Sequence, residues 1–177
     1  ATVLGIEFEV KKGLEFIHTR LKNVSIGSNV TFAKSQVKMS DVEYQFRVLE
    51  ARDGENVEKT RAFQGQAPYL INTFIGYANI DKGLDVNVSY NVQGKSLAIV
   101  GIGRIPDIYD NTFHDVTFKA SKSFGGELKR HKVSFNVNNL LNQKRQRIYS
   151  SFRANDEIFS SFTEGRFFGF SYAYTFK

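Results

Sequence analysis

The sequence has no cysteine and no tryptophan, one methionine and only two prolines among its 177 residues. Without cysteine the chain has no disulfide framework, no thiolate zinc site, no iron–sulfur cluster and no cysteine nucleophile. No run of about 18 apolar residues is present, which excludes a transmembrane helix. The chain begins Ala1-Thr2-Val3, without the basic and apolar segments of a signal peptide. We therefore expect either a cytosolic protein or a chain whose beginning is missing.

Aromatic residues are abundant: 17 Phe and 8 Tyr supply the aromatic content, within a hydrophobic share of 41%. Phe, Tyr, Val, Ile and Thr favour strands, so the composition indicates a β protein. The length suggests one domain. The net charge of +6 is spread along the chain and allows only weak attraction to anionic partners.

Alternation of apolar and polar residues recurs along the chain and predicts seven strands. In the clearest case, the aromatic residues of the last segment share one face. Apolar residues alternate with polar ones in segments 4–10, 24–32, 69–77, 84–92, 116–120, 133–137 and 168–176. No segment predicts a long helix, although 13–22 could form one turn.

The links between these strands alternate in length. Tight turns are expected at 81–83 and at Gly125-Gly126, and a somewhat longer polar link follows Lys11. The other links, 40–67, 101–112 and 143–165, are long. In an antiparallel up-and-down meander all short links lie at one end, a pattern typical of outer-membrane barrels.

A soluble antiparallel sandwich or small barrel, acting as a binding module, would show the same alternation. Aromatic residues near strand ends, opposite faces rich in Asn, Ser, Asp, Gln and Lys, and an aromatic penultimate residue favour the membrane interpretation. Seven meandering strands cannot close without a parallel seam, and open edges in lipid are costly. We therefore expect a fragment of a larger transmembrane barrel.

Several short motifs occur in the order found in one protein family. They are residues 61–72 (RAFQGQAPYLIN), Tyr90-Asn91 with Gly94 and Val100-Gly101, Pro106-Asp107 with Tyr109, 138–142 (NNLLN) and 164–176 (EGRFFGFSYAYTF). With these motifs the chain resembles the C-terminal barrel of TonB-dependent outer-membrane receptors of the Bacteroidota type. The resemblance covers nearly all of residues 1–177, and Lys177 departs from it by following the usual terminal Phe.

The resemblance implies a location in the cell outer membrane and a 22-stranded barrel, whose plug domain and N-terminal strands are absent here. It implies uptake of a large, scarce nutrient such as a ferric siderophore, cobalamin or a glycan, with neither enzymatic activity nor a cofactor. The implied partners are outer-membrane lipid, the barrel-insertion machinery and TonB, which acts through the missing N-terminal region; a surface lipoprotein could be another. The implied barrel-assembly signal is the aromatic row of the last strand: Phe170, Tyr172, Tyr174 and Phe176. The substrate and its ligand-binding residues stay unknown.

Other chemistry is weakly indicated. His18, His114 and His131 are not spaced as metal ligands, and Gly101-Ile102-Gly103 lacks the third glycine of a nucleotide-binding loop. Asp107 and Asp110 could be paired carboxylates, but a solvated loop explains them better. The charged segment 40–61 is also explained best as a solvated loop. The basic run 144–147, with Tyr149 and Phe152 nearby, could bind nucleic acid through charge and stacking. A solvated loop explains this run better as well, so we predict no nucleic-acid partner. A cell-surface adhesin built from barrel strands is a third alternative.

Overall fold

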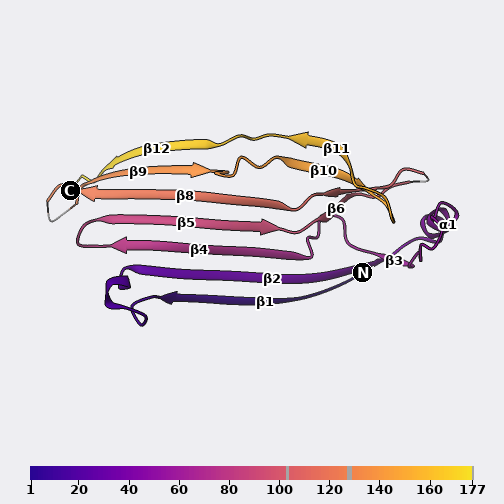
Figure 1. Cartoon of the computed structure of the whole chain (residues 1–177), viewed down its shortest axis with the longest axis horizontal. Helices are drawn as coiled ribbons and strands as arrows, with labels where there is room; N and C mark the ends of the chain where they lie inside the picture. Colours follow the sequence, from indigo (N-terminus) through magenta and orange to yellow (C-terminus); the bar gives the residue numbers. More distant parts are fainter. Residues whose placement is uncertain (103, 127–128, 177) are drawn as a thin grey trace.

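The computed structural model describes residues 1–102, 104–126 and 129–176 and shows an all-β chain with two antiparallel sheets (Figure 1). The larger sheet contains seven long strands in the order β1-β2-β4-β5-β8-β9-β12. Their bounds are Thr2–Gly13 for β1, Val24–Lys38 for β2, Tyr69–Asn79 for β4, Leu84–Gln93 for β5, Phe113–Phe124 for β8, His131–Asn138 for β9 and Phe167–Tyr174 for β12. The seven predicted strands and their meander order are confirmed.

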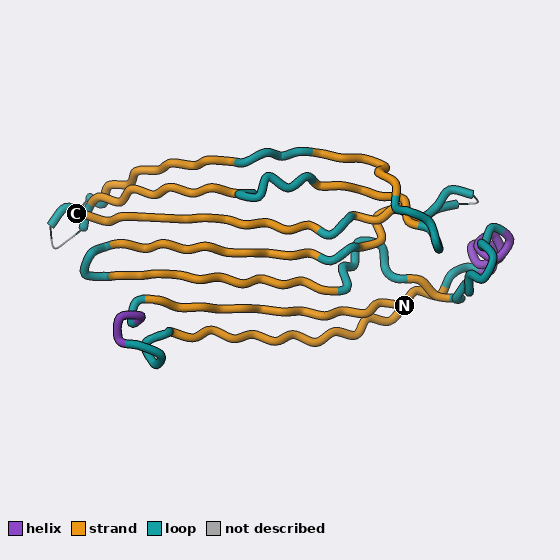
Figure 2. Tube along the Cα trace, in the orientation of Figure 1, coloured by secondary structure: helices purple, strands orange, loops and turns teal. Residues whose placement is uncertain are grey.

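Short and long links lie at opposite ends of this sheet, as predicted (Figure 2). At the turn end, β1 and β2 are joined through the short 3-10 helix η1 (Thr19–Leu21), β4 and β5 through a turn at Gly83, and β8 and β9 through a turn at Gly125. Gly83 has a φ of 61° and Gly125 a φ of 102°, conformations that favour glycine. At the loop end, the long links carry all the remaining secondary structure.

The long links are more ordered than the sequence predicted. Segment 40–61, interpreted as a solvated loop, contains helix α1 (Asp41–Leu49) and the short strand β3 (Thr60–Arg61), which pairs with β2. The side chain of Ser40 accepts a hydrogen bond of 3.1 Å from the backbone N–H of Glu43, so Ser40 caps the helix. The Ser-x-x-Glu spacing is a helix-start signal that the sequence interpretation missed.

A second, four-stranded sheet also lies at the loop end, in the order β11-β10-β7-β6. It is built from β6 (Ser96–Ile99), β7 (Asp107–Asp110), β10 (Arg145–Ser150) and β11 (Glu157–Phe162). The prediction of only seven strands was therefore wrong for the long links, and the link after β5 begins at Gly94 rather than at Gly101. In Figure 1, β10 and β11 extend the paths of β9 and β12 beyond the large sheet.

The large sheet is a single layer. Substantial contacts between elements join strands that are already paired within a sheet, so no second layer covers either face in the described part of the chain. A few buried apolar side chains gather mainly towards the loop end: Met39, Ala67, Val92, Leu97, Ile108, Val137 and Ile148. The face-to-face packing of a sandwich is therefore not formed. Across residues 1–102, 104–126 and 129–176, every helix is too short or too polar to cross a membrane.

Candidate functional site

The register of the seven strands places their apolar residues on one common face, called here the apolar face. Two neighbouring cross-strand rows illustrate it. One row is Ile26, Ile75, Val88, Phe118, Val137 and Phe168, and the next is Val24, Tyr77, Val86, Ala120, Phe135 and Phe170. The face therefore stays apolar across six consecutive strands, and Ile6, Phe8 and Val10 continue it onto β1.

The alternate residues form a second, largely polar face. One of its rows is Ser25, Gly76, Asn87, Lys119, Asn136 and Gly169. The apolar exceptions on this face include Leu70, Phe74, Phe113 and Phe167. Phe74 lies opposite Gly27. A Cβ on Gly27 would overlap the Phe74 ring, so the ring occupies the space that the glycine leaves open.

The apolar face is exposed rather than buried. Phe8 is 59% exposed, Ile75 on the more central strand β4 is 51% exposed, and Phe170 is 73% exposed. Soluble monomers rarely leave apolar patches of this extent uncovered, so this face has the character of a contact surface for another apolar phase or another molecule.

The apolar band runs obliquely across the strands. Glu7 lies midway along β1 between the apolar residues that alternate with it. Its cross-strand row leads to Phe113 on β8. The row through Ser171, at the centre of the apolar run of β12, crosses β8 at Ser121, eight residues further along. At about 3.3 Å per residue, this offset is about 26 Å along the strands, and six strand spacings of about 4.8 Å are about 29 Å across them. The strands are therefore inclined by about 40° to the normal of the band.

Two polar side chains in the middle of the apolar band satisfy each other. The hydroxyl groups of Ser28 and Thr73 lie directly across from one another on β2 and β4, 3.0 Å apart. Hydroxyl groups removed from water without a partner are costly, so this mutual hydrogen bond makes the pair compatible with an apolar environment.

Aromatic and histidine rings gather near the turn end of the apolar face. The His131 ring stacks on Phe124 at 5.2 Å between centroids and lies 4.9 Å from Tyr174. The hydroxyl of Tyr172 lies 2.7 Å from Nδ1 of the same histidine. Near the loop end, the Tyr90 hydroxyl lies 2.7 Å from Nδ1 of His114. The apolar band is thus bordered by rings that carry polar groups.

Three of the four predicted assembly-signal residues, Phe170, Tyr172 and Tyr174, lie on β12 on the apolar face. Phe176 lies two residues beyond the strand, so the terminal strand is shorter than the alternation predicted. The Phe176 ring packs edge-on against Tyr174, with 4.7 Å between centroids. Their role in barrel assembly stays a prediction, and Lys177 lies outside the described residues.

A large open cavity of about 1110 Å³ lies at the loop end. Its walls come from α1, from the segment after it, and from the links around β7 and β10. Val42 and Phe46 of α1 and Ile102 and Ile105 of the β6–β7 link supply largely exposed apolar surface. A cavity of this size could admit a large ligand.

Ion pairs hold the cavity walls together. Arg47 of α1 donates two hydrogen bonds, of 2.8 and 3.1 Å, to the carboxylate of Asp107 on β7. Burial lowers the pKa of Arg47, but the hydrogen bonds and the charge of Asp107 outweigh it and leave that pKa above its ordinary value. Arg61 donates to Glu43 at 2.8 Å, which ties β3 to the helix. These contacts attach α1 firmly to both sheets.

The remaining sequence candidates have structural partners. Asp107 is held by Arg47 and by the backbone N–H of Gly101, whereas Asp110 pairs with Arg147 at 2.8 Å. The two carboxylates therefore serve different contacts rather than one reaction centre. Arg147 and Arg145 lie in β10, so the basic run is largely a strand rather than a loop; Arg145 pairs with Glu164.

Where the structure describes the chain, no three His, Cys, Asp or Glu side chains are grouped closely enough to hold a metal ion. His18 caps the short helix η1, whereas His114 and His131 lie on the apolar face. Gly103 of the Gly101-Ile102-Gly103 segment lies outside the described residues.

Comparison with known proteins gives no assignment. Neither protein-family models, nor curated proteins, nor solved structures give a significant match. The resemblance to TonB-dependent receptors therefore stays a prediction.

Proposed function

We propose that this chain forms part of the wall and the external loops of a transmembrane β-barrel in the bacterial outer membrane. The main support for this proposal is the continuous, exposed apolar face that the strand register forms across seven strands. In lipid this face would be covered by acyl chains, and the polar face would line a water-filled or plugged interior.

The geometry of the apolar band supports this proposal. An inclination of about 40° agrees with the 35–45° at which strands cross the outer membrane. On β8 the band extends over the nine residues from His114 to Lys122. At this inclination the eight rises between these nine residues span about 20 Å, near the height of about 25 Å typical of such barrels. The rings that border the band correspond to the aromatic girdles at the two membrane surfaces.

Closure of the barrel requires further strands. In the described sheet, β1 and β12 each have only one paired neighbour. Unpaired backbone groups cost several kcal/mol each in lipid, so we propose that strands outside this segment pair with both edges. The hydrogen-bonding requirement supports a larger barrel but does not set its strand number.

The assignment to TonB-dependent transport receptors rests on the sequence motifs. Within that proposal, the loop-end cavity faces the cell exterior and captures the nutrient before it enters the barrel. The ion pairs of Arg47 and Glu43 support this role because they give the cavity walls a defined shape. TonB would supply energy through the region that precedes the barrel.

Cell fractionation tests the membrane proposal. Full-length protein should be recovered with outer membranes and should resist carbonate extraction. Recovery in the soluble fraction would instead favour a soluble binding module. A second measurement separates a receptor from an adhesin: a TonB-dependent receptor should be captured by the purified periplasmic domain of TonB, whereas an adhesin should not.

A further inference from the structure

On the described strands of the large sheet, the charged residues of the apolar face are all lysines. The strand residues Lys12, Lys34, Lys38 and Lys122 lie on this face, whereas the strand carboxylates Glu7, Glu9, Asp85 and Asp115 lie on the polar face. A charged side chain is costly against an apolar phase unless its head group reaches a polar boundary. The cost of each lysine therefore depends on whether it lies at an edge of the apolar band or in its middle.

The oblique band places Lys12 and Lys122 at the same edge. The cross-strand row through Lys12 reaches β8 at Phe118. Relative to these cross-strand rows, the apolar band is displaced by about 1.3 residues at each step from one strand to the next. Over the four steps from β1 to β8, the edge of the band at Lys12 therefore moves from the level of Phe118 to between Lys122 and Phe124. His131, on the next strand, lies at this edge too. We call Lys12, Tyr77, Lys122, His131 and Tyr174 the turn-end rim.

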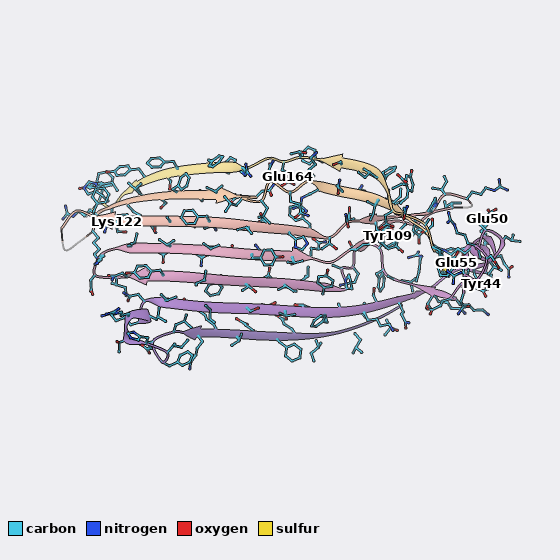
Figure 3. All side chains as sticks on the ribbon, viewed as in Figure 1. Tyr44, Glu50, Glu55, Tyr109, Lys122 and Glu164 are labelled. Carbon is cyan, nitrogen blue, oxygen red and sulfur yellow. The ribbon has the colours of Figure 1, made fainter. Side chains whose placement is uncertain are left out.

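Lys122 is the central cation of this rim and is labelled at the turn end of the sheet in Figure 3. Apolar residues flank it on both sides, Leu84 on β5 and Val133 on β9. Its ammonium group reaches towards the turn and donates to the backbone carbonyl of Lys82. Since an ammonium group has three donors, this contact leaves hydrogen-bonding capacity for an anionic acceptor.

Aromatic rings stand next to this cation. One row further along the apolar face, the His131 ring stacks on Phe124 and is tilted against Tyr174, and the Tyr172 hydroxyl lies beside His131. At the far side of the sheet, Nζ of Lys12 lies 5.6 Å above the ring of Phe16. Rings with an apolar body and a polar edge suit the boundary between acyl chains and head groups.

We propose, on the basis of the membrane function above, that the turn-end rim binds the phosphodiester group of anionic phospholipids, with Lys122 as the principal contact. The lipid is favoured over a free phosphate ion because the same residues border the apolar face, where acyl chains would lie. Since the described strands of the large sheet place no carboxylate on this face, it favours head groups with a net negative charge over zwitterionic ones.

Native mass spectrometry of the purified full-length protein tests this site. Phosphatidylglycerol and phosphatidylcholine with identical acyl chains would be compared as probes. The wild type should retain more phosphatidylglycerol, and Lys122→Gln should reduce that preference about fivefold. Lys122→Arg should keep the preference. Lys119→Gln, on the same strand but on the polar face, is the matched control and should behave as wild type.

Three results would overturn the site: equal retention of both lipids by the wild type, equal losses in Lys122→Gln and Lys119→Gln, or complete displacement of the lipid by inorganic phosphate. High salt should weaken the preference in the wild type, a measurement that needs no variant. Membrane recovery is measured first. A wild type that is not recovered with membranes contradicts the proposed function, whereas normal recovery without lipid preference contradicts only this site.

Discussion

Tyr172 offers the sharpest test of which face meets lipid. It lies near the middle of the apolar band on β12, is 56% exposed, and has Val133 as its cross-strand neighbour. Replacement by lysine would put an ammonium group near the bilayer midplane. We expect Tyr172→Lys to lower the free energy of unfolding by about 2–4 kcal/mol.

Two further variants isolate the effect of the charge. Tyr172→Phe removes only the contact between the tyrosine hydroxyl and His131 and should cost about 1 kcal/mol. Ser171→Lys introduces the same charge one residue earlier, on the polar face opposite Ser134. Ser171 is a better control than Ala173, because a lysine at Ala173 would oppose Lys132 directly.

The measurement is the urea unfolding of the full-length protein in lipid vesicles, together with its level in outer membranes. The expected order of stability is wild type, then Ser171→Lys close to it, then Tyr172→Phe, with Tyr172→Lys lowest. If Ser171→Lys were as damaging as Tyr172→Lys or more so, the two faces would be assigned wrongly.

Three further predictions concern the turns and the loop end. Gly83→Ala should destabilise the protein by at least about 2 kcal/mol in urea unfolding, because Gly83 has a φ of 61° and a Cβ there would overlap the Ser123 carbonyl. Gly126→Ala, at a φ of 72° in open space, should cost less; equal costs would contradict the overlap. Arg47→Ala should speed amide exchange in α1 at least about tenfold, because it breaks a bidentate pair with Asp107. The control Arg104→Ala loses only an exposed pair with Glu50 and should have little effect on this exchange. Similar exchange in both variants would argue against the anchoring role of Arg47. Burial and the charge of Asp107 raise the pKa of Tyr109, and Arg47 opposes them with a smaller effect. The neutral phenol therefore contributes stability to the loop end at any pH below the ordinary tyrosine pKa of about 10. This stability is lost as the pH rises through the higher pKa of the folded state. Amide exchange of β7 should therefore accelerate in alkali in the wild type but less in Tyr109→Phe, and an identical pH profile would refute this.

The alternation along the chain was sufficient to predict the seven long strands. Each strand has a period of two, as in Val86, Val88, Tyr90 and Val92, and this local signal does not depend on which strands pair. The tight turns were also predictable, because Gly83 and Gly125 adopt backbone conformations that favour glycine.

The loop end was predicted poorly because its strands are short and their pairing is not local. β7 has four residues and pairs with β10, about 40 positions later in the chain, so no period could develop within the segment. The charged residues of segment 40–61 suggested a solvated loop, but Glu43 and Arg47 have partners on β3 and β7. For α1, the cap formed by Ser40 left a readable local signal, together with the acidic residues Asp41 and Glu43 of its first turn.

The sequence by itself determined that each strand has one apolar and one polar side, because side chains alternate along any extended backbone. Only the tertiary structure decided that the seven apolar sides join into one oblique band, because a shift of one residue between neighbours would have turned a strand over. It also decided that Lys12 and Lys122, 110 positions apart, reach the same edge of that band. Register is a property of paired strands, and the hydrogen bonds that set it join residues distant in the chain.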